Sequence, residues 1–182
     1  MIFNKLTTYK ETTGFTLVEL IVVIILLGIM SITVSSRFSG ASGYSEYIYQ
    51  ARLISVLRNM QLRAMYDTRE NYCFQVNLVT SPAAFGPPTM SYNIGTALDT
   101  CVTDIDFINN PEFLTTTATE MTQAAVSLST QPNFGFISFN SLGKPIDANG
   151  AMTCNNVCKI TLTGESAVSV CIESEGYIHA CG

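Results

Sequence analysis

Apolar residues are concentrated at one end of this 182-residue chain. Residues 15–34 contain a single charged residue, Glu19, and a helix of that length spans roughly 30 Å, the thickness of the hydrocarbon core of a bilayer. The preceding segment, residues 1–14, carries two lysines and one glutamate, and a positive excess keeps a chain end in the cytoplasm. The pattern predicts one membrane-spanning helix with the rest of the chain outside the cytoplasm.

A second helical pattern follows the apolar segment. Five apolar residues repeat at helical spacing and define one face, namely Leu53, Val56, Leu57, Met60 and Ala64. An unbroken helix from Phe15 to about Thr68 would be roughly 80 Å long. Because glycine is costly inside a helix, Gly40 and Gly43 predict a bend or an unwound turn between the two halves.

Beyond residue 70 the period changes to short alternating or β-branched runs. These runs predict strands over residues 72–79, 90–94, 134–139, 157–163, 167–172 and 177–180. Together they predict an antiparallel sheet, with turns at 163–165 and 174–176 that join the last three strands into a meander. Three prolines and a glycine predict a loop over 81–88, and residues 99–119 show no clear period. The predicted fold class is α+β, with a long N-terminal helix packed on a small antiparallel β-domain.

Charge and histidine content exclude several functions. Fourteen acidic residues against nine basic ones give a net charge of -5, so no general attraction to a phosphate backbone is expected. The chain has one histidine, His179, so a histidine-dependent triad or a multi-histidine metal site cannot form within it. We therefore expect no enzymatic activity.

The six cysteines all lie after residue 70, which indicates disulfides in an oxidising compartment. Fifteen pairings are possible, and we expect the local ones, which close short loops: Cys73 with Cys101, Cys154 with Cys158, and Cys171 with Cys181. The Cys154-x-x-x-Cys158 spacing also occurs in metal sites, but in an exported chain a disulfide is favoured.

Three aspartates, Asp99, Asp104 and Asp106, offer oxygen ligands for calcium. Their spacing lacks the ligand density of a dedicated calcium loop, so no cofactor is expected and calcium is the less favoured alternative.

The N-terminus does not fit a cleaved secretory signal peptide, because its apolar run is too long and begins with a carboxylate. A plain membrane anchor leaves Glu19 unexplained, since an ionised acid in a membrane helix costs several kcal/mol without a partner. Gly14-Phe15-Thr16-Leu17-Val18-Glu19 and the apolar run after it resemble the class III signal of type IV pilins and type II secretion pseudopilins.

This resemblance implies processing and assembly. A prepilin peptidase would cut after Gly14 and methylate Phe15, leaving 168 residues, and Glu19 would pair with the N-terminal amine of a neighbouring subunit. Two buried charges that neutralise each other are tolerable where either alone is not. The implied organisation is a leader (1–14), a membrane and assembly helix (15–36), a periplasmic half of the helix (37–70) and a disulfide-containing β-domain (71–182).

A second resemblance covers the C-terminal half. The sequence Phe-Asn-Ser-Leu-Gly-Lys-Pro at 139–145, with Gly150 and the runs 159–162, 168–172 and 176–178, is similar to pseudopilin H and FimT-like minor pilins. It implies that Gly143 and Gly176 occupy turns. The low charge and the many Ser, Thr and Asn residues also resemble minor pilins of the mannose-sensitive haemagglutinin pilus.

One departure from the FimT-like pattern concerns DNA uptake. The C-terminal turn carries Glu173 and Glu175 in place of basic residues, and carboxylates repel phosphate. A basic strip of Arg58, Arg63 and Arg69 is an alternative, although the helix dipole and pairing with the acids at 67 and 70 explain these arginines more simply.

The expected function is that of a minor pilin, a structural subunit of a type IV pilus. The alternative is a minor pseudopilin of a type II secretion system, and a DNA- or surface-binding pilin is less favoured. Expected partners are other pilins or pseudopilins, the prepilin peptidase, an inner-membrane assembly platform and membrane lipid. The expected location is the bacterial inner membrane, with the C-terminal domain in the periplasm, and then the filament.

Overall fold

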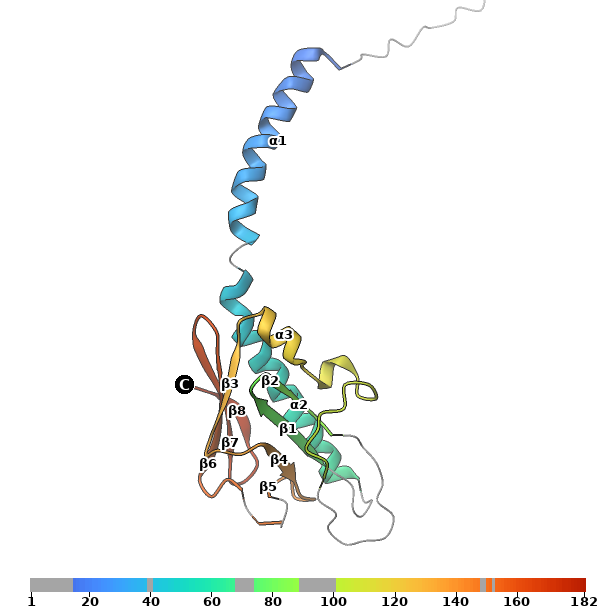
Figure 1. The fold of residues 1–182 in the computed structure, drawn as a ribbon, viewed down its shortest axis with the longest axis vertical. Coiled ribbons are helices and arrows are strands. Elements are labelled where there is room, and N and C mark those ends of the chain that lie inside the picture. The colour runs from blue at the N-terminus through green and yellow to red at the C-terminus, as the bar shows by residue number, and fades with distance from the viewer. Residues whose placement is uncertain (1–14, 39–40, 68–73, 89–100, 148–149, 152) are drawn as a thin grey trace, which may run out of the picture. The chain divides into compact units, whose positions relative to one another are not determined.

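The computed structural model describes residues 15–38, 41–67, 74–88, 101–147, 150, 151 and 153–182, with the side chains of 31–38, 41 and 42 left aside. The chain divides into two compact units, Met1–Gly40 and Ala41–Gly182 (Figure 1). Each unit is described by itself, and the first is called unit 1 and the second unit 2.

Unit 1 contains helix α1, Leu17–Phe38. Thr16 caps its start, because the Thr16 hydroxyl accepts a hydrogen bond from the Glu19 backbone N–H at 3.2 Å. An acid at this third helical position also faces the positive end of the helix dipole. The first turn of the predicted apolar helix is thus locally specified.

Unit 2 begins with a short 3₁₀ turn, η1 (Ala41–Tyr44), followed by helix α2, Ser45–Tyr66. The predicted interruption between the two helical halves is confirmed, and Gly43 lies within η1, whereas Gly40 falls outside the described residues. The buried face of α2 contains all five apolar residues that the periodicity predicted. The helix ends at Tyr66, because Asp67 has an extended backbone.

The strands of unit 2 form two antiparallel four-stranded sheets. Sheet A has the order β2-β1-β4-β5, with β1 Gln75–Thr80, β2 Ala83–Gly86, β4 Phe136–Phe139 and β5 Pro145–Ile146. Sheet B has the order β3-β6-β7-β8, with β3 Ser127–Gln131, β6 Val157–Thr163, β7 Ala167–Glu173 and β8 Ile178–Cys181. The α+β class is confirmed, and the β6-β7-β8 meander forms at the predicted turns.

One expectation for the middle of the chain was wrong, and several elements there were not predicted. The predicted loop over 81–88 contains β2, because Pro82 lies in the β1–β2 turn and the other two prolines follow the strand. Residues 99–119 lead into two short helices, η2 (Glu112–Leu114) and α3 (Ala118–Gln123), and β3 was also not predicted. The strand expected at 90–94 lies outside the described residues.

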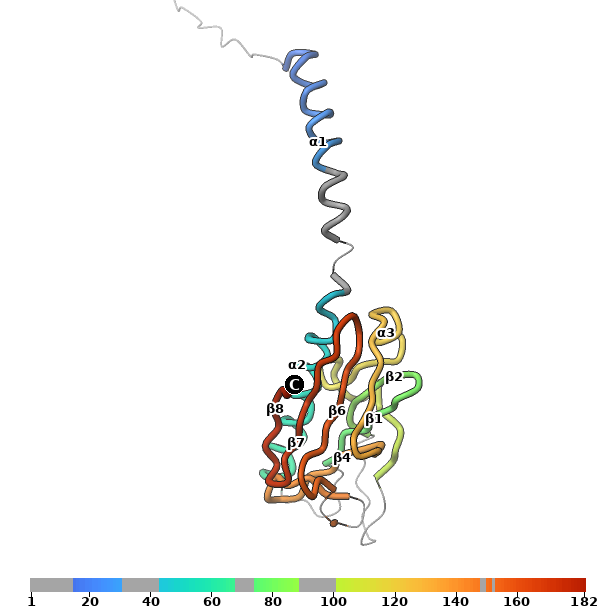
Figure 2. Tube along the Cα trace, turned by 90° about the vertical axis from the view of Figure 1, so that its left-hand side faces the viewer, coloured from blue at the N-terminus to red at the C-terminus, as the bar shows by residue number. Residues whose placement is uncertain are grey.

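The core of unit 2 lies between α2 and the two sheets. Leu57 and Met60 of α2 are fully buried together with side chains from both sheets, among them Ile137 and Ile160. Figure 2 shows α2 behind β7 and β8.

Polar side chains also attach α2 to sheet B. Four of them hydrogen-bond to the β7–β8 side of the sheet: Glu46 to Ser166, Gln50 to the Ser169 carbonyl, Arg58 to the Ile178 carbonyl and Gln61 to the Gly176 carbonyl. These residues, the α2 polar row, follow one side of the helix at spacings of four, eight and three residues. Their partners are the Ser166 turn, β7, the edge strand β8 and the β7–β8 turn, so the row binds sheet B at several points.

Candidate functional site

The start of α1 carries the residues implied in processing and assembly. Phe15 precedes the helix and is largely exposed, while Gly14, the expected cleavage position, lies outside the described residues. Glu19 is exposed in the first turn. Within the described residues its carboxylate has no hydrogen-bond or ion-pair partner, whereas its backbone N–H binds the Thr16 hydroxyl. The carboxylate is therefore available to a group beyond the described residues.

The described side chains of α1 are exposed on every side of the helix. From Phe15 to Met30 each one is exposed, and all except Thr16, Glu19 and Gly28 are apolar. Soluble chains do not leave so large a continuous apolar surface in water, so this helix needs a covering environment that the described residues of unit 1 do not supply.

Among the described residues, no helix combines the length and apolar character of a membrane span. The predicted span over residues 15–34 extends into residues whose side chains lie outside the description, and it stays a prediction.

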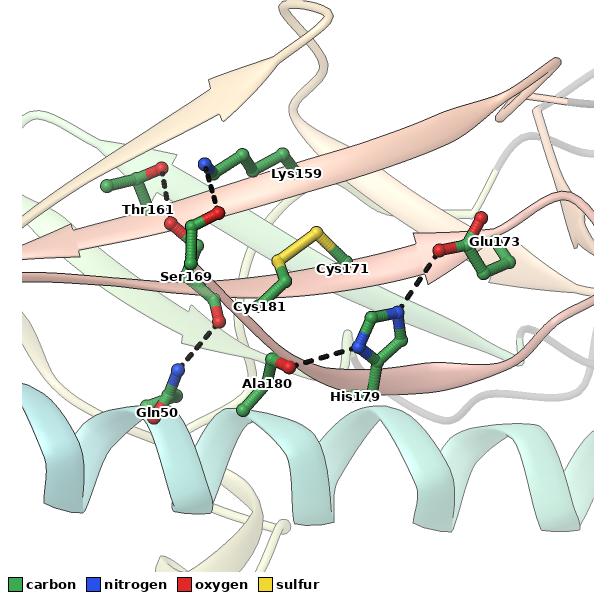
Figure 3. Close-up of a disulfide and its surroundings, with 10 residues drawn as sticks. Gln50, Lys159, Thr161, Ser169, Cys171, Glu173, His179, Ala180 and Cys181 are labelled. Carbon is green, nitrogen blue, oxygen red and sulfur yellow. Dashed lines mark hydrogen bonds and ion pairs between the residues drawn. A yellow bond between two sulfur atoms is a disulfide. The ribbon is translucent and has the colours of Figure 1, made fainter.

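Two of the expected disulfides are present, one at the start of β6 and one between β7 and β8. Cys154 pairs with Cys158, and Cys171 of β7 pairs with Cys181 of β8 (Figure 3). Cys101 is also disulfide-bonded, but Cys73, its expected partner, lies outside the described residues. The two described pairings are confirmed, and both stabilise the C-terminal part of unit 2.

The C-terminal turn is acidic, and its carboxylates have partners. His179 Nε2 lies 3.1 Å from Glu173 Oε1, and Lys144 Nζ lies 2.6 Å from Glu175 Oε2. The hydrogen bond to Glu173 raises the pKa of His179, and the Ala180 carbonyl adds to this shift. The Tyr177 ring stacks on His179 with centroids 4.8 Å apart. Figure 3 shows His179 between Glu173 and Ala180.

The basic strip considered for nucleic acid is only partly described. Arg58 donates from Nη2 to the Ile178 carbonyl at 2.7 Å, so it contributes to holding β8. Arg63 also has a partner, and Arg69 lies outside the described residues. The described arginines therefore have structural contacts, and their role toward nucleic acid stays untested.

The candidate calcium ligands differ in their surroundings. Asp104 is exposed, Asp99 lies outside the described residues, and Asp106 is 8% exposed. Asp106 accepts hydrogen bonds from the backbone N–H groups of Ile108 and Asn109 and from the Asn109 side chain, at 2.9 to 3.0 Å. Over the described part of the chain, no group of three or more acidic, histidine or cysteine side chains could hold a metal ion.

Sequence reasoning missed one buried acid, Glu46, in the first turn of α2. Its Oε1 accepts hydrogen bonds from the backbone N–H and the hydroxyl of Ser166, and the hydroxyl bond is the main cause of a lowered Glu46 pKa. A Cβ on Gly164 would lie 2.7 Å from Glu46 Oε2, so any other residue there would require the Glu46 side chain to shift. The only local signal was an acid at a helix start, because Ser166 lies 120 residues away.

Comparison with known proteins gives one match. Residues 10–35 match the prokaryotic N-terminal methylation motif, which is a type IV pilin-like leader. The match includes Gly14, Phe15 and Glu19 and most of α1. Neither the curated proteins nor the solved structures contain a match to the chain. The motif supports a precursor of the type IV pilin or pseudopilin kind, which implies processing by a prepilin peptidase and contact with other pilins.

Proposed function

We propose that this chain is the precursor of a minor pilin, a structural subunit of a type IV pilus, of the kind found in mannose-sensitive haemagglutinin pili. The methylation motif at residues 10–35 carries the proposal. Two features of the structure support it: an apolar helix that the described residues of unit 1 leave uncovered, and a Glu19 carboxylate that has no partner among the described residues.

The proposed role of Glu19 follows from electrostatics. Cleavage after Gly14 creates a cationic amine at Phe15, four residues before Glu19 in the chain. In an apolar filament core, the Glu19 carboxylate of one subunit and the amine of the next neutralise each other, whereas either charge alone is strongly unfavourable. Because each subunit carries both groups, head-to-tail contacts of this kind extend into an open filament.

The proposed location follows from the same features. Before assembly, α1 lies in the bacterial inner membrane as a single span, with unit 2 in the periplasm, where its disulfides form. The partners are other pilins, the prepilin peptidase and an inner-membrane assembly platform. The proposed role is structural, without enzymatic activity, because the chain supplies apolar packing and one charge pair.

Processing is tested by intact-mass measurement of the protein extracted from membranes, in cells with and without an active prepilin peptidase. We expect a 168-residue chain with a methylated Phe15 only where the peptidase is active. A chain that retains residues 1–14 in the presence of the peptidase would refute the proposal.

Assembly is tested by Glu19→Ala and Glu19→Gln, with Glu175→Ala as a control that removes an exposed acid from unit 2. Membranes and sheared surface filaments are separated, and the share of each variant is compared with the unaltered chain. We expect both Glu19 variants to insert normally, because losing a charge lowers the insertion cost, but to be depleted from filaments about tenfold, equivalent to roughly 1.4 kcal/mol.

Equal incorporation of the Glu19 variants would remove the proposed role of this residue. If the chain supports secretion of a folded exoprotein and is absent from sheared surface filaments, it is a pseudopilin and the pilus assignment is wrong.

A further inference from the structure

Two helices of this chain begin with the same motif, a threonine followed three residues later by a glutamate. The pair is Thr16 and Glu19 at α1, and Thr117 and Glu120 at α3. At both helices the glutamate backbone N–H donates to the threonine hydroxyl at 3.2 Å, and the threonine precedes the first helical residue. Each threonine is thus the N-cap of its helix, and each glutamate occupies the third helical position.

The glutamate of α3 uses its two carboxylate oxygens for different partners. Glu120 Oε2 accepts hydrogen bonds from the Thr117 backbone N–H at 2.7 Å and from the Thr117 hydroxyl at 2.9 Å, which completes a capping box. The other oxygen, Oε1, lies 3.2 Å from Nη1 of Arg52, which belongs to α2. One carboxylate therefore closes the box at its own helix and binds a cation from a second helix.

At α1 only the first half of the capping box is formed. The Glu19 backbone N–H is bound to the Thr16 hydroxyl, whereas the Glu19 carboxylate has no partner among the described residues. Closing the box requires a new rotamer of Glu19, because the Thr16 N–H is a donor at a helix start that the helix itself does not bind. An apolar environment favours this rotamer, since a carboxylate without donors is costly at low dielectric.

We propose that Thr16 is a positioning residue for Glu19. When lipid or neighbouring subunits cover α1, Thr16 and Glu19 close the capping box, which holds one carboxylate oxygen at the helix start and leaves the other for a cation. In the filament that cation is the N-terminal amine of a neighbouring subunit, in the place that Arg52 takes at Glu120. The inference rests on the proposed function, because it names the residue that orients the acid on which assembly depends.

The capping box also serves the subunit before assembly. In the inner membrane the Glu19 carboxylate has no amine from a second subunit, and an ionised acid without donors is strongly unfavourable there. Thr16 supplies two donors, its backbone N–H and its hydroxyl, as Thr117 does for Glu120. Assembly adds the amine to the remaining oxygen, so the carboxylate is already oriented when the neighbour arrives. Such preorganisation lowers the cost of forming the contact.

Backbone amide exchange tests whether the capping box closes at α1. The full-length chain is placed in lipid nanodiscs, and the exchange of the Thr16 and Thr117 amides is followed by NMR. Thr117 is the internal reference, because its N–H is bound to Glu120. We expect Glu19→Ala to accelerate exchange at Thr16 about tenfold without changing Thr117, as for the loss of one hydrogen bond to a charged acceptor. Glu120→Ala should have the reverse effect.

Filament incorporation tests whether the capping box acts through Glu19. Thr16→Ser keeps the hydroxyl and Thr16→Val replaces it by a methyl group, and each is combined with Glu19 and with Glu19→Ala. The share in sheared filaments is divided by the amount of processed chain in membranes. We expect Thr16→Val to lower this ratio about fivefold with Glu19 present and less than about twofold in Glu19→Ala, because residues that act together are not additive. Thr16→Ser, and Thr163→Val at an exposed position of sheet B, should behave like the unaltered chain.

A threonine that only stabilises the helix start would give the same loss with and without Glu19, and that result would overturn the inference. So would a Thr16 amide whose exchange does not respond to Glu19→Ala, or a processed Thr16→Val chain that enters filaments at the unaltered level. If the peptidase does not process Thr16→Val, the amide exchange decides. Those outcomes leave the proposed function intact, whereas absence of the unaltered chain from filaments refutes the proposed function and the inference with it.

Discussion

The two long helices, α1 and α2, each contain 22 residues and carry one acid in the first turn. They differ in how much of their side-chain surface is buried. In α1 the described side chains are exposed on all sides and Glu19 has no side-chain partner among the described residues. In α2 one apolar face is fully buried and Glu46 is bound by Ser166. The apolar face of α2 is covered within unit 2, whereas the described residues of unit 1 leave α1 uncovered.

Matched leucine substitutions give the largest expected difference between the helices. Leu57→Ala removes a fully buried side chain of α2 and should lower the free energy of unfolding of unit 2 by about 2–5 kcal/mol. Leu26→Ala removes an exposed side chain of α1 and should leave that free energy unchanged. Denaturant unfolding of the detergent-solubilised chain, followed by near-UV circular dichroism, measures both. A similar loss for Leu26→Ala would show that unit 2 depends on α1.

The α2 polar row gives an intermediate effect. Gln61 Nε2 donates to the carbonyls of both Gly143 and Gly176, at 2.7 and 2.6 Å, whereas Gln50 donates to the Ser169 carbonyl alone. We expect Gln61→Ala to destabilise unit 2 by about 1–3 kcal/mol and Gln50→Ala by about half as much. The first variant leaves two carbonyls without their donor, and the second leaves only one. Equal effects in chemical denaturation would contradict this ranking.

The buried acid of α2, Glu46, should link the stability of unit 2 to pH. Hydrogen bonds from Ser166 lower the Glu46 pKa in the folded state, so the ionised form stabilises unit 2 above the unfolded pKa of about 4.3 and this contribution is lost as pH falls through the folded value. Glu46→Gln should flatten the acid side of the stability profile. Melting temperatures between pH 3 and pH 7 measure the change, and an unchanged profile for Glu46→Gln would refute the role of Glu46.

The smallest effect is expected at His179. Its pKa is raised mainly by Glu173, so its stabilising contribution is complete below the unfolded pKa of about 6.5 and disappears as pH rises through the folded value. Because the His179–Glu173 pair is partly exposed, His179→Gln should change the melting temperature only slightly, and only at pH values below the folded-state pKa of His179. An NMR titration of the His179 ring that gives a pKa below the ordinary histidine value would contradict the assignment.

Local patterns predicted the local features of this fold. The buried face of α2 follows from a period of 3.6 residues, and the last three strands follow from alternation and short turns. Helix α3 escaped prediction because six residues make fewer than two turns, and β2 was hidden because prolines border it closely. The methylation motif at residues 10–35 could be recognised from the sequence because it is a contiguous stretch.

Long-range contacts were beyond sequence reasoning. Glu46 and Ser166 are 120 residues apart, and Gln61 and Gly143 are 82 residues apart, so no local period reports that they meet. The burial of Asp106 next to exposed apolar residues could not be predicted either, because this segment looks like an irregular loop until the exposure of its residues is known. The disulfides were an exception, since cysteines that close loops of 4 and 10 residues are constrained by proximity in the chain.

The α2 polar row gives unit 2 a mechanical property. Figure 3 shows α2 lying alongside β7 and β8, so a pull along the helix axis would shear its hydrogen bonds to the sheet rather than peel them open one after another. Bonds loaded in shear share the force, and the Cys171–Cys181 crosslink prevents β8 from separating from β7 as the load rises. Tension that enters at the start of α2 is thus distributed over its whole length and reaches the sheet at several points together.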